Sequence, residues 1–262
     1  MAHAIALTLH AADPTGAGLQ GDLAVFAALD VRCVSVVTAV AVRSGAAAGI
    51  LHEFPAAAVR AQLEASAGEP LPAAVKVGFL SKTPVVRLVA ADLAKRGVPA
   101  VVDPVFVSRS GPRHLAAPSW AAFLRELLPA AALVTPNLPE ASLLAGFPIR
   151  GEADAKRAAR AIQAHGPRAV LIKGGHAEGG DLVDGLLDGR TWRAFAGPRI
   201  GDSPVPGAGD ALSAAITAYL ARGETLPDAV EHGLAFVRRA IAAARGEGLD
   251  GCLLVDRSAA AP

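Results

Sequence analysis

The chain has 262 residues, a length that suits one large α/β domain or two small ones. Hydrophobic residues make up 52% of the chain and aromatic residues only 4%, so the core must be built mostly from Ala, Val and Leu. The 25 basic and 24 acidic residues give a formal net charge of +1, which indicates neither nucleic acid nor a membrane surface as a partner.

The start of the chain and its cysteines indicate a cytoplasmic protein. Residues 1–12 lack the basic region and the long apolar run of a signal peptide, and we interpret them as leading into a first strand. No apolar run approaches the ~20 residues that a membrane span needs. Cys33 and Cys252 lie far apart in the sequence and form no metal-type spacing, so we expect two thiols in a reducing cytosol.

In the first half of the chain, short apolar runs typical of buried strands alternate with helical patterns. The strands are expected at residues 5–9, 34–42, 75–80 and 100–103, and the helices at residues 19–30, 54–67, 84–96 and 120–128.

The second half continues the alternation. Strands are expected at residues 132–135, 169–172, 182–187 and 191–195, and helices just after Glu140 and at residues 153–165, 211–222 and 227–245. Asp188 and Gly189 predict a type I′ hairpin between the last two strands. Without a linker, repeat or low-complexity tract, the pattern predicts a single α/β domain over residues 1–262. Its sheet would be mostly parallel, with helices on both faces.

Residues 205–213 place a glycine-flanked turn directly before a helical pattern. Gly207 and Gly209 permit a tight turn without side chains that would block a ligand. Free N–H groups at such a helix start, together with the helix dipole, favour an anion such as a phosphate. Asp210 would repel that anion, so its expected use is to take a proton from an attacking nucleophile. The alternative is a simple helix cap in which Asp210 is the acceptor.

Other polar groups follow predicted strands or start predicted helices. Because ligands bind beyond the carboxyl ends of the strands in an open parallel sheet, these groups are candidate site residues. They are Asp13, Asp103, Asn137, Glu140 and Lys173.

Phosphoryl transfer needs an anion cradle, a cation, a metal holder and a base near the acceptor hydroxyl, and the sequence offers a candidate for each. The glycine turn would form the cradle, Asp210 would be the base, and Lys173 would meet the triphosphate. Asn137 and Glu140, three residues apart, could hold Mg²⁺ through its water molecules, because Mg²⁺ prefers oxygen ligands and retains water. No Walker-type Gly-x-x-x-x-Gly-Lys-Ser/Thr motif is present, which excludes a P-loop enzyme.

Five stretches resemble the hydroxymethylpyrimidine/phosphomethylpyrimidine kinases of thiamine biosynthesis, which belong to the ribokinase-like superfamily. The stretches are Asp-Pro-Thr-Gly-Ala-Gly-Leu-Gln-Gly-Asp (13–22), Val-Val-Asp-Pro-Val-Phe-Val (101–107), Thr-Pro-Asn-Leu-Pro-Glu-Ala (135–141), Leu-Ile-Lys-Gly-Gly-His (171–176) and Gly-Ala-Gly-Asp (207–210). The last three are shared across ribokinase-like kinases, whereas the first two point to the pyrimidine branch. The resemblance runs from about Ile5 to Ala240.

The resemblance implies a single-domain ribokinase-like three-layer α/β/α sandwich with a mostly parallel central sheet and no separate lid domain. It implies that the chain uses ATP and Mg²⁺ to phosphorylate 4-amino-5-hydroxymethyl-2-methylpyrimidine, its monophosphate, or both. Since related enzymes are commonly dimers, it also implies a homodimer.

Matching positions assign roles to individual residues. On the nucleotide side, Gly207, Ala208 and Gly209 would form the anion hole. Lys173 and Gly175 would contact ATP phosphate. Asn137 and Glu140 would face the metal and the triphosphate. The pyrimidine pocket would be lined by Asp13, Gly16, Arg43, Phe79 and Val105.

Three departures from the family pattern bear on substrate choice. Asp210 stands where the pyrimidine kinases usually carry cysteine, and aspartate there is typical of sugar and pyridoxal kinases. Arg43 replaces a glutamine that recognises the pyrimidine, and Val205 replaces a threonine. A pyridoxal-type or other ring-hydroxymethyl kinase, or a non-catalytic ligand-sensing relative, is therefore an alternative.

Each of these residues also has a structural interpretation. Asp13 could order its turn, and Lys173 could be an exposed strand-end lysine. Glu140 could be a first-turn carboxylate that interacts favourably with the helix dipole. Arg43 could bind a substrate phosphate or be solvated, and His10, like His176, is interpreted as structural or peripheral.

Overall fold

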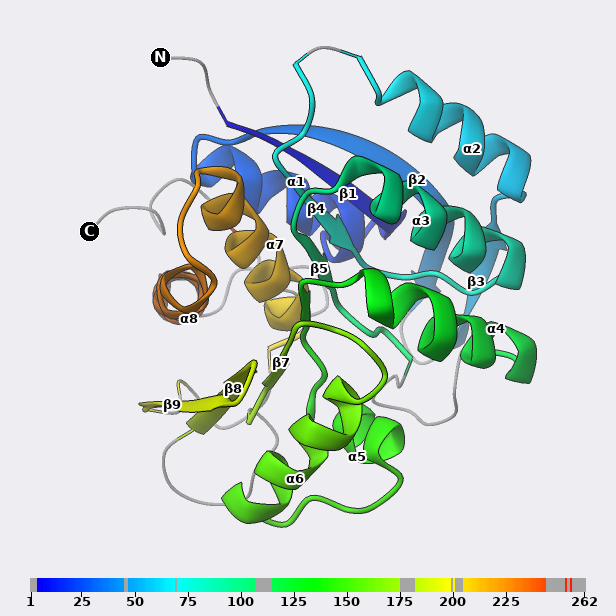
Figure 1. Ribbon diagram of the computed structural model, residues 1–262. Coiled ribbons are helices and arrows are strands. Elements are labelled where there is room, and N and C mark those ends of the chain that lie inside the picture. The colour runs from blue at the N-terminus through cyan, green and yellow to red at the C-terminus, as the bar shows by residue number, and fades with distance from the viewer. Residues whose placement is uncertain are drawn as a thin grey trace.

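The structure is a computed structural model that describes residues 4–44, 47–68, 70–106, 115–174, 182–198, 200, 205–243, 253 and 255. Its centre is a nine-stranded sheet with the strand order β3-β2-β1-β4-β5-β6-β7-β8-β9 (Figure 1). The strands are β1 (Ile5–Ala12), β2 (Arg32–Ser44), β3 (Ala47–Glu53), β4 (Ala74–Val77), β5 (Ala100–Val102), β6 (Leu133–Val134), β7 (Ala169–Ile172), β8 (Leu182–Asp188) and β9 (Thr191–Gly197).

Strands β2, β1, β4, β5, β6 and β7 run parallel to one another, while β3, β8 and β9 are antiparallel to their neighbours. The parallel strands are short apolar runs that are buried on both faces, as expected when helices cover both sides of a sheet.

Helices cover both faces of this sheet. They are α1 (Gly18–Ala28), α2 (Ala56–Ala65), α3 (Thr83–Arg96), α4 (Ala117–Ala122), α5 (Leu138–Ala145), α6 (Glu152–Gln163), α7 (Ala208–Ala221) and α8 (Leu226–Ala243). Within the described residues, none of them is long and apolar enough to cross a membrane.

Two hydrophobic clusters show which helices share a face. One cluster joins the sheet to α2, α3, α4, α5 and α6, and the other joins it to α1, α7 and α8 (Figure 1). Alternate strand residues divide between the clusters: Leu7 belongs to the first and Ala6 to the second. The three-layer α/β/α fold with a mostly parallel sheet is therefore confirmed.

The strand order reverses beside β1. The chain moves outward from β1 to β2 and β3, then returns to β4 on the other side of β1 and continues through β5, β6 and β7. Such a reversal leaves a crevice at the carboxyl ends of the two central strands, which is where open α/β sheets bind ligands.

The sequence did not predict β3. Residues 47–53 contain one β-branched residue, Ile50, and therefore give little strand signal. The strand forms as an antiparallel partner of β2, with Val40 opposite His52.

The hairpin between β8 and β9 was predicted, but its turn type was wrong. Asp188 pairs with Thr191, so the two-residue loop is Gly189 and Arg190, one position beyond the predicted one. A type I′ turn needs positive φ at both central residues, and in the described chain Gly189 has positive φ (57°) while Arg190 does not.

The helix predicted at residues 120–128 is also more irregular than expected. It consists of α4, a π-helical turn η1 (Phe123–Leu127) and a 3₁₀ turn η2 (Leu128–Ala130) that contains Pro129. The proline has no N–H to continue the α-helical hydrogen bonds, which accounts for the stop.

Candidate active site

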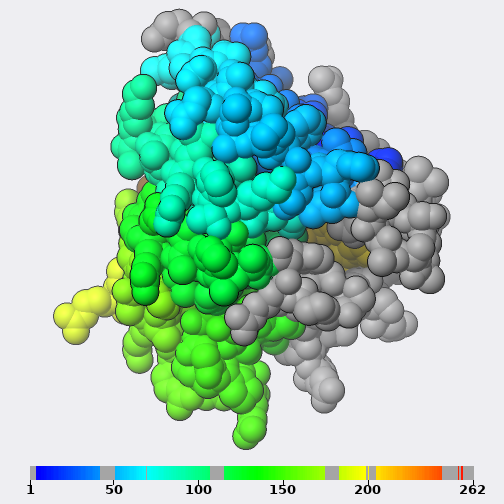
Figure 2. All heavy atoms as spheres, turned by 90° about the vertical axis from the view of Figure 1, so that its right-hand side faces the viewer, coloured from blue at the N-terminus to red at the C-terminus, as the bar shows by residue number. Residues whose placement is uncertain are grey.

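The carboxyl ends of the parallel strands carry several of the candidate site residues. One or two residues beyond β1, β4, β5, β6 and β7 lie, in that order, Asp13, Phe79, Asp103, Thr135 and Lys173. The N-terminus of α7 begins at the same edge, because Asp210 contacts a residue of β1. In Figure 2, gold atoms of the segment that begins α7 are visible just below the blue atoms of the β2–β3 region.

The start of α7 is built for an anion rather than for a side-chain cap. Gly207 is the N-cap residue, with φ of 82° in the left-handed region that favours glycine, and no side chain of the described residues caps the helix. The interpretation of Asp210 as a capping acceptor is therefore wrong. The first-turn N–H groups lack a capping side chain, which leaves them suited to an anion.

The Asp210 carboxylate is instead held by three groups from other elements. Oδ1 lies 3.0 Å from His10 Nε2 and 3.7 Å from Lys76 Nζ, and Oδ2 accepts a 3.3 Å hydrogen bond from the Gly18 N–H. Its side chain is 18% exposed, so it still reaches solvent.

The electrostatic surroundings of Asp210 favour the carboxylate. Burial raises its pKa, but the charges of Lys76 and His10 outweigh this effect and hold the pKa of Asp210 below its ordinary value. Asp210 is consequently ionised throughout the neutral range, as a general base must be.

A buried ion pair lies directly behind Asp210, and the sequence analysis did not predict it. Lys76 on β4 pairs with Asp22 on α1, and both side chains are fully buried. Lys76 Nζ also donates to the Asp210 backbone carbonyl (3.2 Å), and Thr8 donates to the other oxygen of Asp22 (2.6 Å). The carboxylates outweigh the effect of burial and raise the pKa of Lys76, so its ammonium stays charged.

Lys173 forms the second charged group of the site. Its Nζ donates to Asp103 Oδ1 (2.9 Å), and its side chain is 13% exposed. A Cβ placed on Gly209 would lie 3.1 Å from that Nζ, so the ammonium lies against the glycine turn. The interpretation of Lys173 as an exposed lysine is wrong, and its ammonium lies beside the turn that was predicted to cradle the anion.

Asp103 links the lysine to α7. One of its oxygens also accepts from Thr135 (3.0 Å), and the other accepts from Ser213 on α7 (3.2 Å). The strand-end position of Asp103 was noted from the sequence, but its part in holding Lys173 was not predicted.

Asn137 and Glu140 form a reciprocal capping box at the start of α5. The Asn137 side chain accepts from the Glu140 N–H (2.9 Å), and the Glu140 carboxylate accepts from the Asn137 N–H (3.0 Å). The other Glu140 oxygen faces the Phe106 N–H at 3.4 Å. Burial raises the pKa of Glu140 to about 7, although the nearby Lys173 opposes the rise.

The predicted substrate residues divide into two groups. Phe79 and Val105 pack together with Ala11 and Ala39 in a small apolar cluster at the strand ends, which could take one face of a ring. Asp13 is 2% exposed. Its Oδ1 accepts from the N–H (3.0 Å) and the hydroxyl (2.7 Å) of Thr15, which fits the turn-ordering interpretation.

Gly16, the next predicted substrate residue, has φ of 92° in the same turn and donates its N–H to the Asp13 carbonyl (3.2 Å). One other predicted position lies outside the described residues, and a second is described only in its backbone. Gly175 falls in the undescribed range 175–181, and of Arg43 only the backbone, in β2, is described. His176 lies in the same undescribed range.

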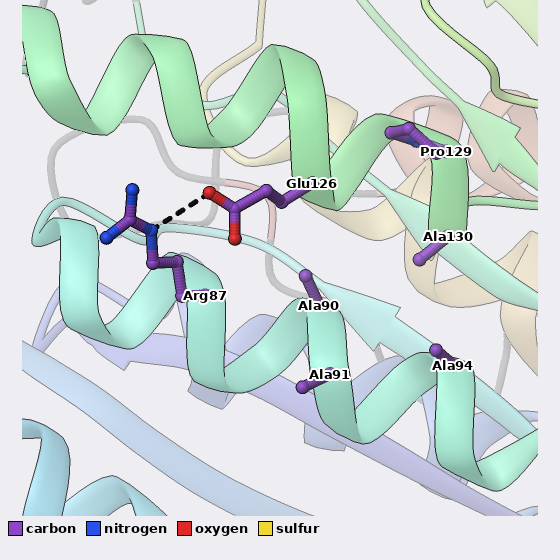
Figure 3. A pocket seen from close by; sticks show the side chains of 7 residues that line it. All are labelled: Arg87, Ala90, Ala91, Ala94, Glu126, Pro129 and Ala130. Carbon is purple, nitrogen blue, oxygen red and sulfur yellow. Dashed lines mark hydrogen bonds and ion pairs between the residues drawn. The ribbon is translucent and has the colours of Figure 1, made fainter.

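A separate hollow of about 340 Å³ lies between α3 and η1 (Figure 3). Its lining is mostly alanine, with the Arg87–Glu126 ion pair (2.9 Å) across it. It shares no residue with the strand-end cluster and lacks an anion cradle, so the candidate active site is the cluster around Asp210.

Comparisons with known proteins identify the family of the chain. The family model for phosphomethylpyrimidine kinase matches residues 13–251, which include every group described above except Thr8, His10 and Ala11. The chain belongs to the phosphomethylpyrimidine kinase family. A hydroxymethylpyrimidine/phosphomethylpyrimidine kinase of Rhizobium meliloti (strain 1021) is 41% identical over 243 residues, covering 92% of this chain and 91% of that protein. The resemblance drawn from the five motifs is thereby confirmed.

Solved structures of two kinases are similar to this fold. The phosphomethylpyrimidine kinase from Clostridium difficile 630 superimposes with a TM-score of 0.80 at 32% identity, over 90% of this chain and 99% of that one. The pyridoxal kinase from Staphylococcus aureus, in complex with AMP-PCP and pyridoxal, gives 0.83 at 32% identity, over 92% and 88%. Members of the phosphomethylpyrimidine kinase family and pyridoxal kinases therefore share this architecture.

Proposed function

We propose that the protein transfers a phosphoryl group from ATP to the hydroxymethyl group of 4-amino-5-hydroxymethyl-2-methylpyrimidine, of its monophosphate, or of both. The observation that carries the proposal is the placement of an ionised, partly exposed Asp210 at the glycine turn that Lys173 borders. The name of the Rhizobium relative supports the pyrimidine substrate, and the AMP-PCP complex of the Staphylococcus kinase supports ATP.

The chain's own residues divide the work between a base and an electrostatic clamp. Asp210 would take the proton of the attacking hydroxyl, so that the alcohol oxygen can form its new bond to phosphorus as the bond to ADP breaks. The Lys173 ammonium and the N–H groups at Gly207, Ala208 and Gly209 would hold the anionic oxygens, where fixed positive groups stabilise the transition state.

The donor set around Asn137 and Glu140 fits Mg²⁺ bound through water. The oxygens that could face the ion belong to the side chains of Asp103, Asn137 and Glu140. Hard oxygen donors of this kind suit Mg²⁺. These oxygens already accept hydrogen bonds from the protein, so contact through the ion's water molecules is the arrangement they allow. When bound, the ion would offset phosphate charge.

The apolar cluster of Phe79 and Val105 would hold the ring of the substrate, with Asp13 and Gly16 shaping the neighbouring turn. Arg43 would recognise a phosphate of the substrate, if the monophosphate is the acceptor. Gly175 would contact nucleotide phosphate.

An ADP-release assay with three acceptors tests the function. We expect turnover with the hydroxymethylpyrimidine, its monophosphate, or both, and much less with pyridoxal. A pyridoxal-type kinase is the alternative because the chain carries aspartate at position 210, and faster turnover of pyridoxal would replace the first proposal with it. ATP binding without ADP release from any acceptor would instead indicate a ligand-sensing relative.

Replacement of the base tests the mechanism. Asp210→Asn keeps the shape of the side chain but cannot take a proton, so we expect kcat to fall by ~10²–10⁴-fold with little change in ATP affinity. Steady-state kinetics together with nucleotide titration separates the two quantities. Near-normal turnover in this variant would remove Asp210 from the base role.

We further propose that the protein acts as a homodimer in the cytoplasm, which follows from its similarity to related enzymes. Sedimentation velocity at two protein concentrations tests the dimer, and a single species at the monomer mass would refute it.

A further inference from the structure

His10 occupies a slot that two glycines leave open. The ring belongs to β1 and its side chain is 5% exposed. A Cβ on Gly78 would overlap the imidazole ring, and a Cβ on Gly18 would lie 3.2 Å from its Nδ1. The space for this ring is therefore built from residues of β1, the β4 end and the start of α1.

The hydrogen bond of the ring is made to Asp210. Nε2 lies 3.0 Å from Oδ1 of that carboxylate, and because an ionised carboxylate can only accept, Nε2 must carry the hydrogen. The other nitrogen, Nδ1, is buried and has no hydrogen-bond partner among the described residues. A buried polar ring held by one bond to one carboxylate is not explained by core packing, which an apolar side chain would achieve at lower cost.

Three charged groups from three elements face His10: Asp210 on α7, Lys76 on β4 and Asp22 on α1. Two carboxylates against one ammonium leave a negative charge that a protonated imidazole would balance. Burial lowers the pKa of His10, but the Asp210 charge and hydrogen bond outweigh it, so the pKa is raised above its ordinary value.

We propose that His10 is a positioning residue for Asp210. By holding Oδ1, it fixes the carboxylate so that Oδ2, whose contact with the Gly18 N–H is the longer one (3.3 Å), is the oxygen that takes the proton of the acceptor alcohol. The proposal rests on the proposed function, because it concerns the base of that reaction.

Two substitutions separate the hydrogen bond from the charge of the ring. His10→Leu removes both, whereas His10→Gln places an amide nitrogen near the position of Nε2 and restores the hydrogen bond without the charge. We expect His10→Leu to lower kcat at least tenfold with the KM for ATP within twofold of the wild type, and His10→Gln to recover most of the loss. The matched control is His232→Gln, which alters an exposed histidine paired with Glu224 at 2.7 Å and should leave kcat unchanged.

The pH profile gives a second readout. Asp210 is ionised throughout the neutral range, so kcat there should not depend on its protonation. Lys76 remains in place in both His10 variants and keeps the carboxylate charged. The relative loss of kcat in His10→Leu should therefore be the same across the neutral range, because the variant changes the position of Asp210 and not its charge. A loss that grows as the pH falls would overturn the positioning role.

A double variant decides whether His10 acts through Asp210. In the Asp210→Asn background, His10→Leu should cause no further loss of kcat, because the group that it positions is gone. An equal loss in both backgrounds, or a kcat of His10→Leu within twofold of the wild type, would overturn the proposal. If His10→Leu does not fold, His10→Met replaces it, and a kcat of that variant within twofold of the wild type would overturn the proposal. Absence of wild-type turnover on every acceptor would instead refute the proposed function, and the inference with it.

Discussion

The glycine turn shows how single residues define the reacting end of the site. Gly207 adopts a left-handed φ that starts α7, and Gly209 leaves the space in which the Lys173 ammonium lies beside the turn. Neither glycine provides a reactive group. Both determine how close a phosphate could come to the N–H groups and the lysine.

Filling that space should therefore weaken nucleotide handling. The Cβ of a Gly209→Ala variant would lie 3.1 Å from Lys173 Nζ, closer than an ordinary contact, so the ammonium must move. We expect a rise in the KM for ATP and a fall in kcat, together about tenfold or more in kcat/KM, corresponding to at least ~1.4 kcal/mol. Steady-state ADP release measures both.

Gly68→Ala is the matched control for that change, because no atom of the described residues beyond its own chain neighbours lies within 4 Å of the added Cβ. Wild-type kinetics in this control and in Gly209→Ala alike would show that the turn needs no open space at position 209.

Residue types and strand ends were enough to single out Lys173, Asp210 and the glycine turn as candidates, because their chemistry is local to a motif. His10 and Lys76 belong to no such motif, and Asp22, the last residue of the 13–22 stretch, was given no role from the sequence. His10 and Lys76 meet Asp210, and Asp22 meets Lys76, only after β1, β4, α1 and α7 have packed. Their contacts therefore depend on register and not on spacing along the chain. Gly78 was the available signal, since a glycine after a buried strand indicates a close approach.

At the scale of elements, the Lys76–Asp22 pair ties α1, β4 and α7 together. Lys76 reaches the Asp22 side chain and the Asp210 backbone carbonyl from the middle of the sheet. A fully buried ion pair of this kind is not evidence of a large net stabilisation, but breaking it leaves an uncompensated charge in the core.

Lys76→Met should consequently lower the free energy of unfolding by ~3–5 kcal/mol, since Asp22 loses its partner in a fully buried position. Urea denaturation measures the loss. The double variant Asp22→Leu/Lys76→Met removes both charges and should recover part of it.

The comparison pair is Arg87–Glu126, whose side chains are 62% and 40% exposed. Arg87→Met should cost less than ~1 kcal/mol, because solvent screens that pair. If Lys76→Met and Arg87→Met lowered the free energy of unfolding equally, the buried ion pair would contribute no more to stability than the exposed one.

Element order could be predicted from hydrophobic periodicity, while the departures came from pairing. β3 has little strand propensity and forms because β2 offers an edge. The β8–β9 turn shifted by one residue because Asp188 and Thr191 close the ladder. Propensity is a local quantity, and cross-strand partners decide such cases.

At the scale of the whole molecule, the candidate site draws on both sides of the topological reversal. Groups at the ends of β1, β5 and β7 meet the start of α7, and the Lys76 pair lies behind them on β4. No part of this arrangement persists if the central sheet opens. Ligand binding should therefore be linked to unfolding of the entire described sheet and not to one segment of it.

A thermal shift experiment tests this linkage. A ligand that binds the folded state alone at 100 times its Kd adds ~2.7 kcal/mol to the unfolding free energy. For a chain of this size that corresponds to a rise in Tm of about 5–10 °C. We expect AMP-PCP with Mg²⁺ to produce one cooperative transition displaced by this amount, measured by scanning calorimetry. Asp210→Asn should show a similar rise because it retains the phosphate cradle, whereas Gly209→Ala should show a smaller one. Two transitions, of which one keeps its Tm when the nucleotide is added, would contradict the linkage. A ligand whose site needs the intact sheet cannot stabilise only part of that sheet.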